Sequence, residues 1–249
     1  MPKLAALVAI LFLAPVARAA DVVVLGAGAS RSAFTAAVDE WQKKSGHAVK
    51  ASFGSAGEIR ERLAKGEKPD LLVVPQENLA DYEKAGSIDA ATRRDLGAVS
   101  IGAAVKEGAP KPDISTPESL KHTLESAKSV TYMDPARGTS GKYVDEVVLP
   151  KLGIRDAVRA KTQLGEGGYI AEKVARGDVE IALHQMTELL PVKGITILGP
   201  LPAELQKVTV YSGVVMKGAA HPAEARALLD YLASPEGRKA FLDRGFSAP

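Results

Sequence analysis

The segment that most constrains the fold is a valine-rich strand that breaks into a turn of small residues and then into a helix. It covers residues 21–34, with the sequence DVVVLGAGASRSAF. Residues 22–25 predict a buried strand, residues 26–30 predict a turn without bulky side chains, and a helix is expected from Arg31. Backbone N–H groups and a helix N-terminus then point at one spot, which favours a bound anion.

The same turn begins the glycine pattern of dinucleotide-binding folds, G-x-G-x-x-G. Arg31 stands where the third glycine would be, and residues 49–53 (VKASF) offer no acid at the ribose-binding distance. These two departures disfavour a dinucleotide site. A strand-turn-helix unit without any ligand stays an open alternative for this segment.

Composition excludes several classes of protein. The 249 residues are 46% hydrophobic and 25% charged, which is typical of a globular chain with one large or two modest domains. The 32 basic and 30 acidic residues are mixed along the sequence, so nucleic acid is not an expected partner. The chain has no cysteine, and its core therefore needs no disulfide.

The N-terminus has the pattern of a secretory signal peptide. Lys3 precedes an apolar run over residues 4–16, and ARAA follows at 17–20. This run is too short to cross a bilayer, so we expect residues 1–19 to be a cleaved signal peptide and the mature chain not to be inserted in the membrane. Export of a cysteine-free chain favours a periplasmic location.

Strand and helix patterns alternate along the rest of the chain, which predicts an α/β fold. Strands are expected at residues 48–53, 68–75, 99–105, 129–132 and 179–184. Further turns rich in small residues follow at 54–57, 133–141 and 165–168. Turns after parallel strands meet at one edge of a sheet, where ligands bind. The nucleophile and metalloprotease motifs G-x-S-x-G and H-E-x-x-H do not occur in the sequence.

Five motifs occur in an order that resembles the periplasmic molybdate-type solute-binding proteins of ABC transporters, over nearly the whole mature chain. They are FGSA at 53–56, KPDLLVV at 68–74, DPARGTSG at 134–141, RGDVEIAL at 176–183 and LDYLASPEG at 229–237. The resemblance implies a two-lobed type II binding protein, in which each lobe is a mostly parallel sheet flanked by helices. Lobe one is expected at residues 20–98 plus 217–249, and lobe two at residues 99–216.

The resemblance also implies a set of ligand-binding residues, because the family holds an oxyanion between its lobes with hydroxyls and backbone N–H groups. The matching positions are Ala29 with Ser30 beside it, Ser55, Ser140, Gly167 and Gln185. The family has a serine at the position of Ala29 and a tyrosine at that of Gln185. These two substitutions favour a larger anion than molybdate, such as a di- or tricarboxylate.

Three arginines strengthen the expectation of a carboxylate ligand, since guanidinium groups bind carboxylates in a bidentate way. Arg31, Arg60 and Arg137 each lie in or just after a proposed binding turn. Arg137 is the strongest candidate because Thr139 and Ser140 share its turn. A solvated arginine at a helix start is the open alternative for each.

Part of the sequence resembles a branch of the family that includes the periplasmic aconitate isomerases. The matching segments are KEGAPKPDI at 106–114, YMDPARGTSG at 132–141 and HQMTELLPV at 184–192. Isomerisation moves a proton across an allylic system, so it needs an acid and a base but no cofactor. His184, Glu166 and Glu188 are the titratable candidates, and we select His184 as the catalytic candidate. Strand alternation predicts that only one of His184 and Gln185 reaches the ligand.

Two functions are therefore expected from the sequence. The favoured one is a periplasmic protein that binds a small anion and delivers it to an ABC permease. The alternative is an aconitate isomerase on the same scaffold, since a fold alone does not determine a function. Neither function requires a cofactor or a metal ion. A histidine packed against a helix is the alternative interpretation of His184.

Overall fold

The computed structural model describes residues 20–249. The predicted signal peptide, residues 1–19, lies outside the described residues. Within residues 20–249, no helix has both the length and the apolar character that crossing a membrane requires.

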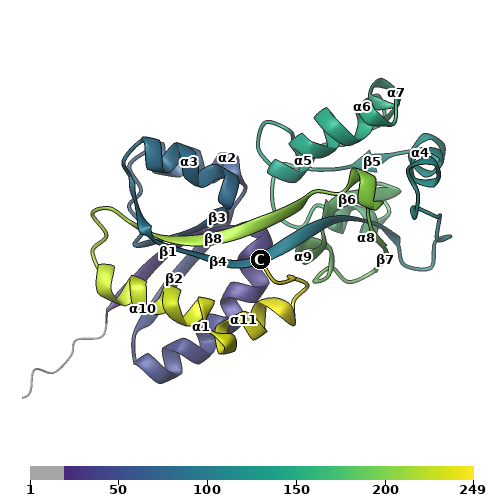
Figure 1. The fold of residues 1–249 in the computed structure, drawn as a ribbon. Coiled ribbons are helices and arrows are strands. Elements are labelled where there is room, and N and C mark those ends of the chain that lie inside the picture. The colour runs from purple at the N-terminus through teal and green to yellow at the C-terminus, as the bar shows by residue number, and fades with distance from the viewer. Residues whose placement is uncertain (1–19) are drawn as a thin grey trace, which may run out of the picture.

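The first part of the sheet is built from both ends of the chain (Figure 1). β1 (Asp21–Ala27) pairs in parallel with β2 (Ala48–Gly54) and with β3 (Leu71–Pro75). β8 (Val208–Met216) pairs antiparallel with β3 and with the first part of β4 (Ile88–Lys106). All five residues of β3 are buried, which accounts for its continuous apolar sequence.

β4 continues into the second part of the sheet, where it pairs antiparallel with β6 (Ile181–Gln185) and β7 (Ile195–Pro200). The short β5 (Val130–Thr131) pairs in parallel with β6. Both β4 and β8 run the length of the junction between the two parts in Figure 1. The whole sheet is mixed, with parallel pairs at its two ends and antiparallel crossing strands between them.

Helices cover both faces of the first part of the sheet. α1 (Arg31–Ser45), α10 (Pro222–Ala233) and α11 (Pro235–Leu242) pack together on one face, and α2 (Ala56–Ala64) and α3 (Gln76–Lys84) lie on the other (Figure 1). Gly46 caps the C-terminus of α1, and its φ of 72° is the left-handed conformation that glycine adopts without steric cost. The C-terminal helices therefore stabilise the N-terminal strands.

Shorter helices surround the second part of the sheet. They are α4 (Pro117–Ser126), α5 (Thr139–Tyr143), a π-helical turn (Val144–Val148), α6 (Leu149–Lys151), α7 (Arg155–Arg159), α8 (Glu172–Arg176) and α9 (Met186–Leu189). Two 3₁₀ turns complete the fold, at Gly28–Ser30 and Ala203–Leu205. Most of these helices are one or two turns long, so packing against the sheet rather than their own hydrogen bonds stabilises them.

Two large hydrophobic clusters form the interior. One contains apolar residues of β1, β3, β8, α1 and α10, with Phe34 and Leu229 fully buried. The other contains residues of α4, β5, the π-helical turn and β6, with Tyr132 and Leu183 wholly or almost wholly buried. The cavity described below lies between the elements of these two clusters.

The main difference from the sequence prediction is the length of β4. A strand was expected at residues 99–105, whereas β4 extends over 19 residues. Its first part contains Arg93, Arg94 and Asp95 in succession, so the sequence lacks the alternation of apolar and polar residues that indicates a strand. Pairing with β8, with two shifts of register, makes this polar segment extended.

Candidate functional site

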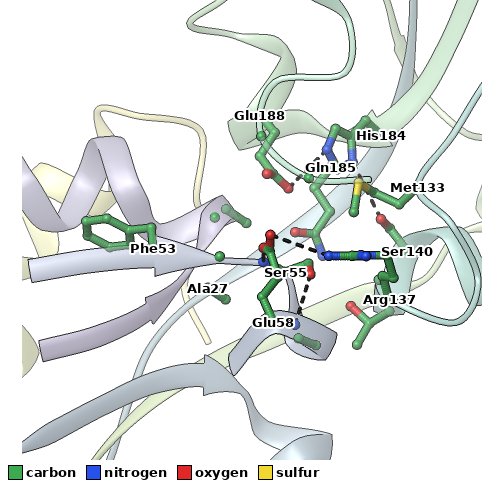
Figure 2. A pocket seen from close by; sticks show the side chains of 18 of the residues that line it. Ala27, Phe53, Ser55, Glu58, Met133, Arg137, Ser140, His184, Gln185 and Glu188 are labelled. Atoms are coloured by element: carbon green, nitrogen blue, oxygen red, sulfur yellow. Dashed lines mark hydrogen bonds and ion pairs between the residues drawn. The ribbon is translucent and has the colours of Figure 1, made fainter. Parts of the chain in front are cut away.

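A cavity of about 330 Å³ lies where turns from the two parts of the sheet face one another (Figure 2). The first part contributes the ends of β1 and β2 with the residues that follow them. The second part contributes the turn at 137–140, the turn at 166–168 and the end of β6. The four small-residue turns noted in the sequence therefore meet at one place.

The turn after β1 presents backbone but no hydroxyl to the cavity. Ala27, Gly28 and Ala29 line the wall. Ser30 is fully buried behind them and does not line it; its hydroxyl donates to the Ala27 carbonyl oxygen at 2.7 Å. Because Gly28–Ser30 form a 3₁₀ turn, Ala29 lines the cavity while the Ser30 side chain lies in the protein interior. Of the predicted pair Ala29 and Ser30, only Ala29 reaches the cavity.

Ser55 lines the second turn and caps α2 together with Glu58. The Ser55 hydroxyl accepts from the Glu58 N–H at 3.2 Å, and the Ser55 N–H donates to Glu58 Oε2 at 2.6 Å. This reciprocal arrangement is a capping box. The Glu58 carboxylate is thereby held at the N-terminus of α2, on the cavity wall.

Arg137 approaches Glu58 from the opposite side of the cavity (Figure 2). Its Nη2 is 3.5 Å from Glu58 Oε1, and its carbonyl oxygen accepts from the Gly57 N–H at 2.9 Å. Arg137 Nε is buried and has no hydrogen-bond partner among the residues that the structure describes. Thr139 and Ser140, in the first turn of α5, line the cavity next to it. Arg137 therefore retains one unsatisfied N–H donor next to the cavity.

The other two candidate arginines lie in different surroundings. Arg31 lines the cavity, and its guanidinium carbon is 5.6 Å from the centroid of the Phe53 ring and 5.7 Å from that of Tyr169. These cation–π contacts orient its charge. Arg60 does not line this cavity; it is exposed, and its Nη2 donates to the Ala136 carbonyl at 3.3 Å.

His184, Ser140 and Glu188 form a buried group in the cavity wall (Figure 2). His184 Nδ1 lies 3.5 Å from Ser140 Oγ, and His184 Nε2 lies 3.3 Å from Glu188 Oε2. The second contact is off the line of a hydrogen bond, so within residues 20–249 Nε2 has no hydrogen-bond partner. His184 is only 1% exposed, yet it borders the cavity. Such an imidazole can exchange a proton with a small bound molecule.

Glu188 reaches across the cavity to the turn after β1. A Cβ atom added to Gly28 would lie 2.7 Å from Glu188 Oε1. Any side chain at position 28 would displace this carboxylate. Gly28 therefore allows Glu188 and His184 to remain paired.

Gln185 is held by a buried tyrosine. The Tyr211 hydroxyl donates to Gln185 Oε1 at 2.5 Å. Burial, and then the charge of Glu188, raise the pKa of Tyr211 well above 10, so the phenol stays protonated. The Gln185 amide nitrogen has no partner in the described part of the chain. It is therefore a free donor in the cavity wall.

Strand alternation predicted that only one of His184 and Gln185 faces the ligand, whereas both line the cavity. β6 ends at Gln185, where the chain turns directly into α9. The cavity lies beyond this strand end, so residues from both faces of the strand reach it.

The turn at 166–168 forms the rim. Gly167 lies opposite Glu58, and a Cβ atom there would be 3.4 Å from Glu58 Oε2. Glu166 is exposed at the mouth. The cavity thus contains two arginines and three glutamates. No group of three or more His, Cys, Asp or Glu side chains suited to a metal ion occurs in residues 20–249.

Comparison with known proteins identifies the family of this chain. The family of bacterial extracellular solute-binding proteins matches residues 22–247. This chain belongs to that family. An aconitate isomerase from a Pseudomonas species is 39% identical over 187 residues, which cover 75% of this chain and 70% of that protein. A molybdate-binding protein from Azotobacter vinelandii is 27% identical over 244 residues, or 94% of this chain and 92% of that protein.

A solved structure shares the fold. The periplasmic molybdate-binding protein of Azotobacter vinelandii superposes with a TM-score of 0.77 at 17% identity, over 92% of this chain and 99% of that chain. The predicted resemblance to molybdate-type solute-binding proteins is confirmed, as is the predicted α/β fold of periplasmic binding proteins. The resemblance to the branch with aconitate isomerases is confirmed as well.

Most of the predicted site residues meet at the cavity. Those that line it are Ala29, Ser55, Arg137, Thr139, Ser140, Gly167, His184 and Gln185. Sequence reasoning did not find Glu58 or Tyr211 as site residues. The pattern Ser55-x-x-Glu58 is a capping-box signature that indicates the place of Glu58. Tyr211 had no local signal, because it reaches the site through the pairing of β8 with β3 and β4.

Proposed function

We propose that this protein is a periplasmic aconitate isomerase that shifts a proton within a tricarboxylate bound in the cavity. The observation that carries the proposal is the buried His184 beside Glu188, with Nε2 free of hydrogen bonds. Simple capture of an anion needs donors but no proton-exchanging group. The 39% identity to an aconitate isomerase supports the same conclusion.

In the proposed reaction, His184 Nε2 removes a proton from the CH₂ group of cis-aconitate that adjoins the double bond. The electron pair spreads over the allylic system and its carboxylates. Return of the proton to the far alkene carbon moves the double bond by one position, which gives the trans isomer and restores the imidazole. The Glu188 carboxylate, 3.3 Å away, stabilises the imidazolium in between. One proton is removed and one is returned, and these reaction steps use no cofactor.

The remaining cavity residues bind and orient the substrate in this proposal. Arg137 donates from Nε and Gln185 from its amide nitrogen, since both atoms lack a partner in the part of the chain described. The Thr139 and Ser140 hydroxyls and the Gly167 backbone add neutral donors. A charged donor fixes one carboxylate, and the neutral donors fix the others without attracting a compact ion as strongly.

We further propose that residues 20–98 plus 217–249 and residues 99–216 act as two lobes that close on the ligand after export by a signal peptide at residues 1–19. Domain closure about crossing strands excludes water from the reacting atoms. The membership in an extracellular solute-binding family supports this location.

A second candidate function is ligand delivery to an ABC permease. The observation that favours it is the identity to molybdate-binding proteins, together with the hydroxyl-bearing turns at Ser55 and Ser140. In that case the ligand is a di- or tricarboxylate, or a molybdate-like oxyanion, and the protein releases it unchanged.

One experiment separates the two functions. The purified protein is incubated with cis-aconitate in D₂O and followed by proton NMR. An isomerase produces trans-aconitate, whose alkene and methylene proton signals grow as those of cis-aconitate decline. A carrier raises its own melting temperature with aconitate but leaves the aconitate spectrum unchanged. The second result would refute the proposed isomerase.

A further inference from the structure

The carboxylate of Glu58 occupies donors that an anion at this site would otherwise use. It accepts the Ser55 N–H at 2.6 Å and lies 3.5 Å from Arg137 Nη2. A helix N-terminus and an arginine are both strong anion-binding groups. In this protein, the Glu58 carboxylate takes the place of a bound anion at the Ser55 N–H and beside Arg137.

Two glycines leave room for this carboxylate. A Cβ atom at Gly54 would lie 2.9 Å from Glu58 Oε2, and one at Gly167 would lie 3.4 Å from the same atom. The Glu58 side chain is 38% exposed, so it borders the cavity rather than lying behind its wall. Glu58 is therefore held in place by close neighbours from both parts of the fold.

A second protein carboxylate faces the cavity from the other side. Glu188 lies between His184 and Gly28, and with Glu58 it offsets the charges of Arg137 and Arg31. A tetrahedral oxyanion concentrates two negative charges within the space of a few atoms, so contact with Arg137 also brings it against Glu58. A tricarboxylate spreads its charges over a carbon skeleton, and its CH groups can face the two glutamates.

We propose that Glu58 is a specificity-determining residue that excludes compact inorganic oxyanions and thereby reserves the cavity for extended polycarboxylates. This inference rests on the proposed function, because it explains how a site with molybdate-type ancestry selects a tricarboxylate. Like-charge contact against the wrong ligand is a recognised route to selectivity.

The test compares Glu58→Gln with Glu61→Gln. Glutamine at position 58 removes the charge and retains an acceptor for the Ser55 N–H, because glutamine also serves in capping boxes. Glu61 lies on the same helix and is exposed, so its substitution is the matched control. The full protein and both variants are titrated calorimetrically with sodium molybdate, sodium sulfate and sodium trans-aconitate. Melting curves establish that each variant is folded.

We expect Glu58→Gln to raise the affinity for molybdate and sulfate relative to trans-aconitate by at least about tenfold. Glu61→Gln leaves this ratio unchanged. Glu58→Ala, which lacks the side-chain half of the capping box as well as the charge, shifts the ratio in the same direction and provides a second measurement. A shift smaller than about tenfold in both Glu58 variants would overturn the inference.

This outcome is distinguishable from failure of the isomerase proposal. Oxyanion affinity is measured without turnover, so a wild-type protein that does not isomerise aconitate can still show the shift in Glu58→Gln. Conversely, a wild-type protein that isomerises aconitate while Glu58→Gln shows no shift refutes the role of Glu58 alone.

Discussion

Tyr211 and Gln185, which both line the cavity, show how one buried side chain orients the donor of another. Because the phenol donates to the amide oxygen, the amide nitrogen is left for the cavity. An ionised Tyr211 could no longer donate to the Gln185 amide oxygen and would instead accept from the amide nitrogen. The raised pKa of Tyr211, caused first by burial, prevents that.

Tyr211→Phe therefore weakens ligand binding. The phenylalanine cannot donate, so the Gln185 amide loses its fixed orientation, and we expect the Kd for trans-aconitate to rise about tenfold. The measurement is calorimetric titration. Tyr231→Phe, on α10, is the control and leaves the Kd unchanged. Equal affinities of wild type and Tyr211→Phe would contradict the positioning role of Tyr211.

At the scale of elements, Asp145 ties the π-helical turn to its neighbours. Its carboxylate accepts from Arg159 Nε at 2.6 Å, from Arg155 Nη2 at 2.7 Å and from the Tyr132 hydroxyl at 3.0 Å. The side chain is 1% exposed. Burial raises its pKa, but the hydrogen bonds from Arg155, Tyr132 and Arg159 outweigh burial and lower it below 3.8.

This lowered pKa predicts acid sensitivity. A carboxyl with a lower pKa in the folded than in the unfolded state stabilises the fold above the unfolded value of 3.8, and the contribution is lost as pH falls through the folded pKa. Asp145→Asn should lose about 2–3 kcal/mol of unfolding free energy at pH 7, because two arginines remain without their carboxylate. Urea unfolding from pH 7 to pH 3 measures both effects.

The exposed Asp178, paired with Arg176 at 2.9 Å, provides the control. Asp178→Asn should change stability by less than about 1 kcal/mol, as exposed ion pairs do. If Asp145→Asn loses stability on acidification as steeply as the wild type does, the Asp145 network is not the source of the pH dependence.

Sequence reasoning succeeded where signals are local. Residues 22–25 and 71–74 read as buried strands because helices cover both their faces, and the small-residue turns after the strands marked the cavity. It failed for Ser30, because the local 3₁₀ geometry determines whether this side chain faces the cavity or the interior. It also failed for Tyr211, because strands that are far apart in the sequence pair to bring this residue to the site. The polar first part of β4 was missed for the second reason.

At the scale of the whole molecule, several contacts join α1, α2 and α3 to the second part of the fold across the cavity and its surroundings. The Gly57 N–H donates to the Arg137 carbonyl at 2.9 Å, Lys207 Nζ donates to Glu77 at 2.6 Å, and Arg31 lies over the Tyr169 ring. The proposed closure of the two lobes depends on such contacts. They place the N-terminus of α2 against the turn that bears Arg137.

Gly57→Ala tests closure. A Cβ atom there would lie 3.1 Å from Arg137 Cα and 3.4 Å from its carbonyl oxygen, which are backbone atoms that cannot rotate away. Alanine favours the helix itself, so any loss reflects the contact across the cavity. We expect about tenfold weaker binding of trans-aconitate, and a larger radius of gyration by X-ray scattering in its presence. Glu61→Ala on the same helix is the control; a compact Gly57→Ala with wild-type affinity would contradict the role of this contact.

The most direct test of the account is the rate at which His184→Gln converts cis-aconitate to trans-aconitate. We expect the wild type and His122→Gln, which alters an exposed histidine on α4, to isomerise cis-aconitate in D₂O at equal rates. His184→Gln should be slower by at least about 100-fold while trans-aconitate still raises its melting temperature. A His184→Gln rate within a few-fold of wild type, or no isomerisation by the wild type, would contradict the proposed isomerase.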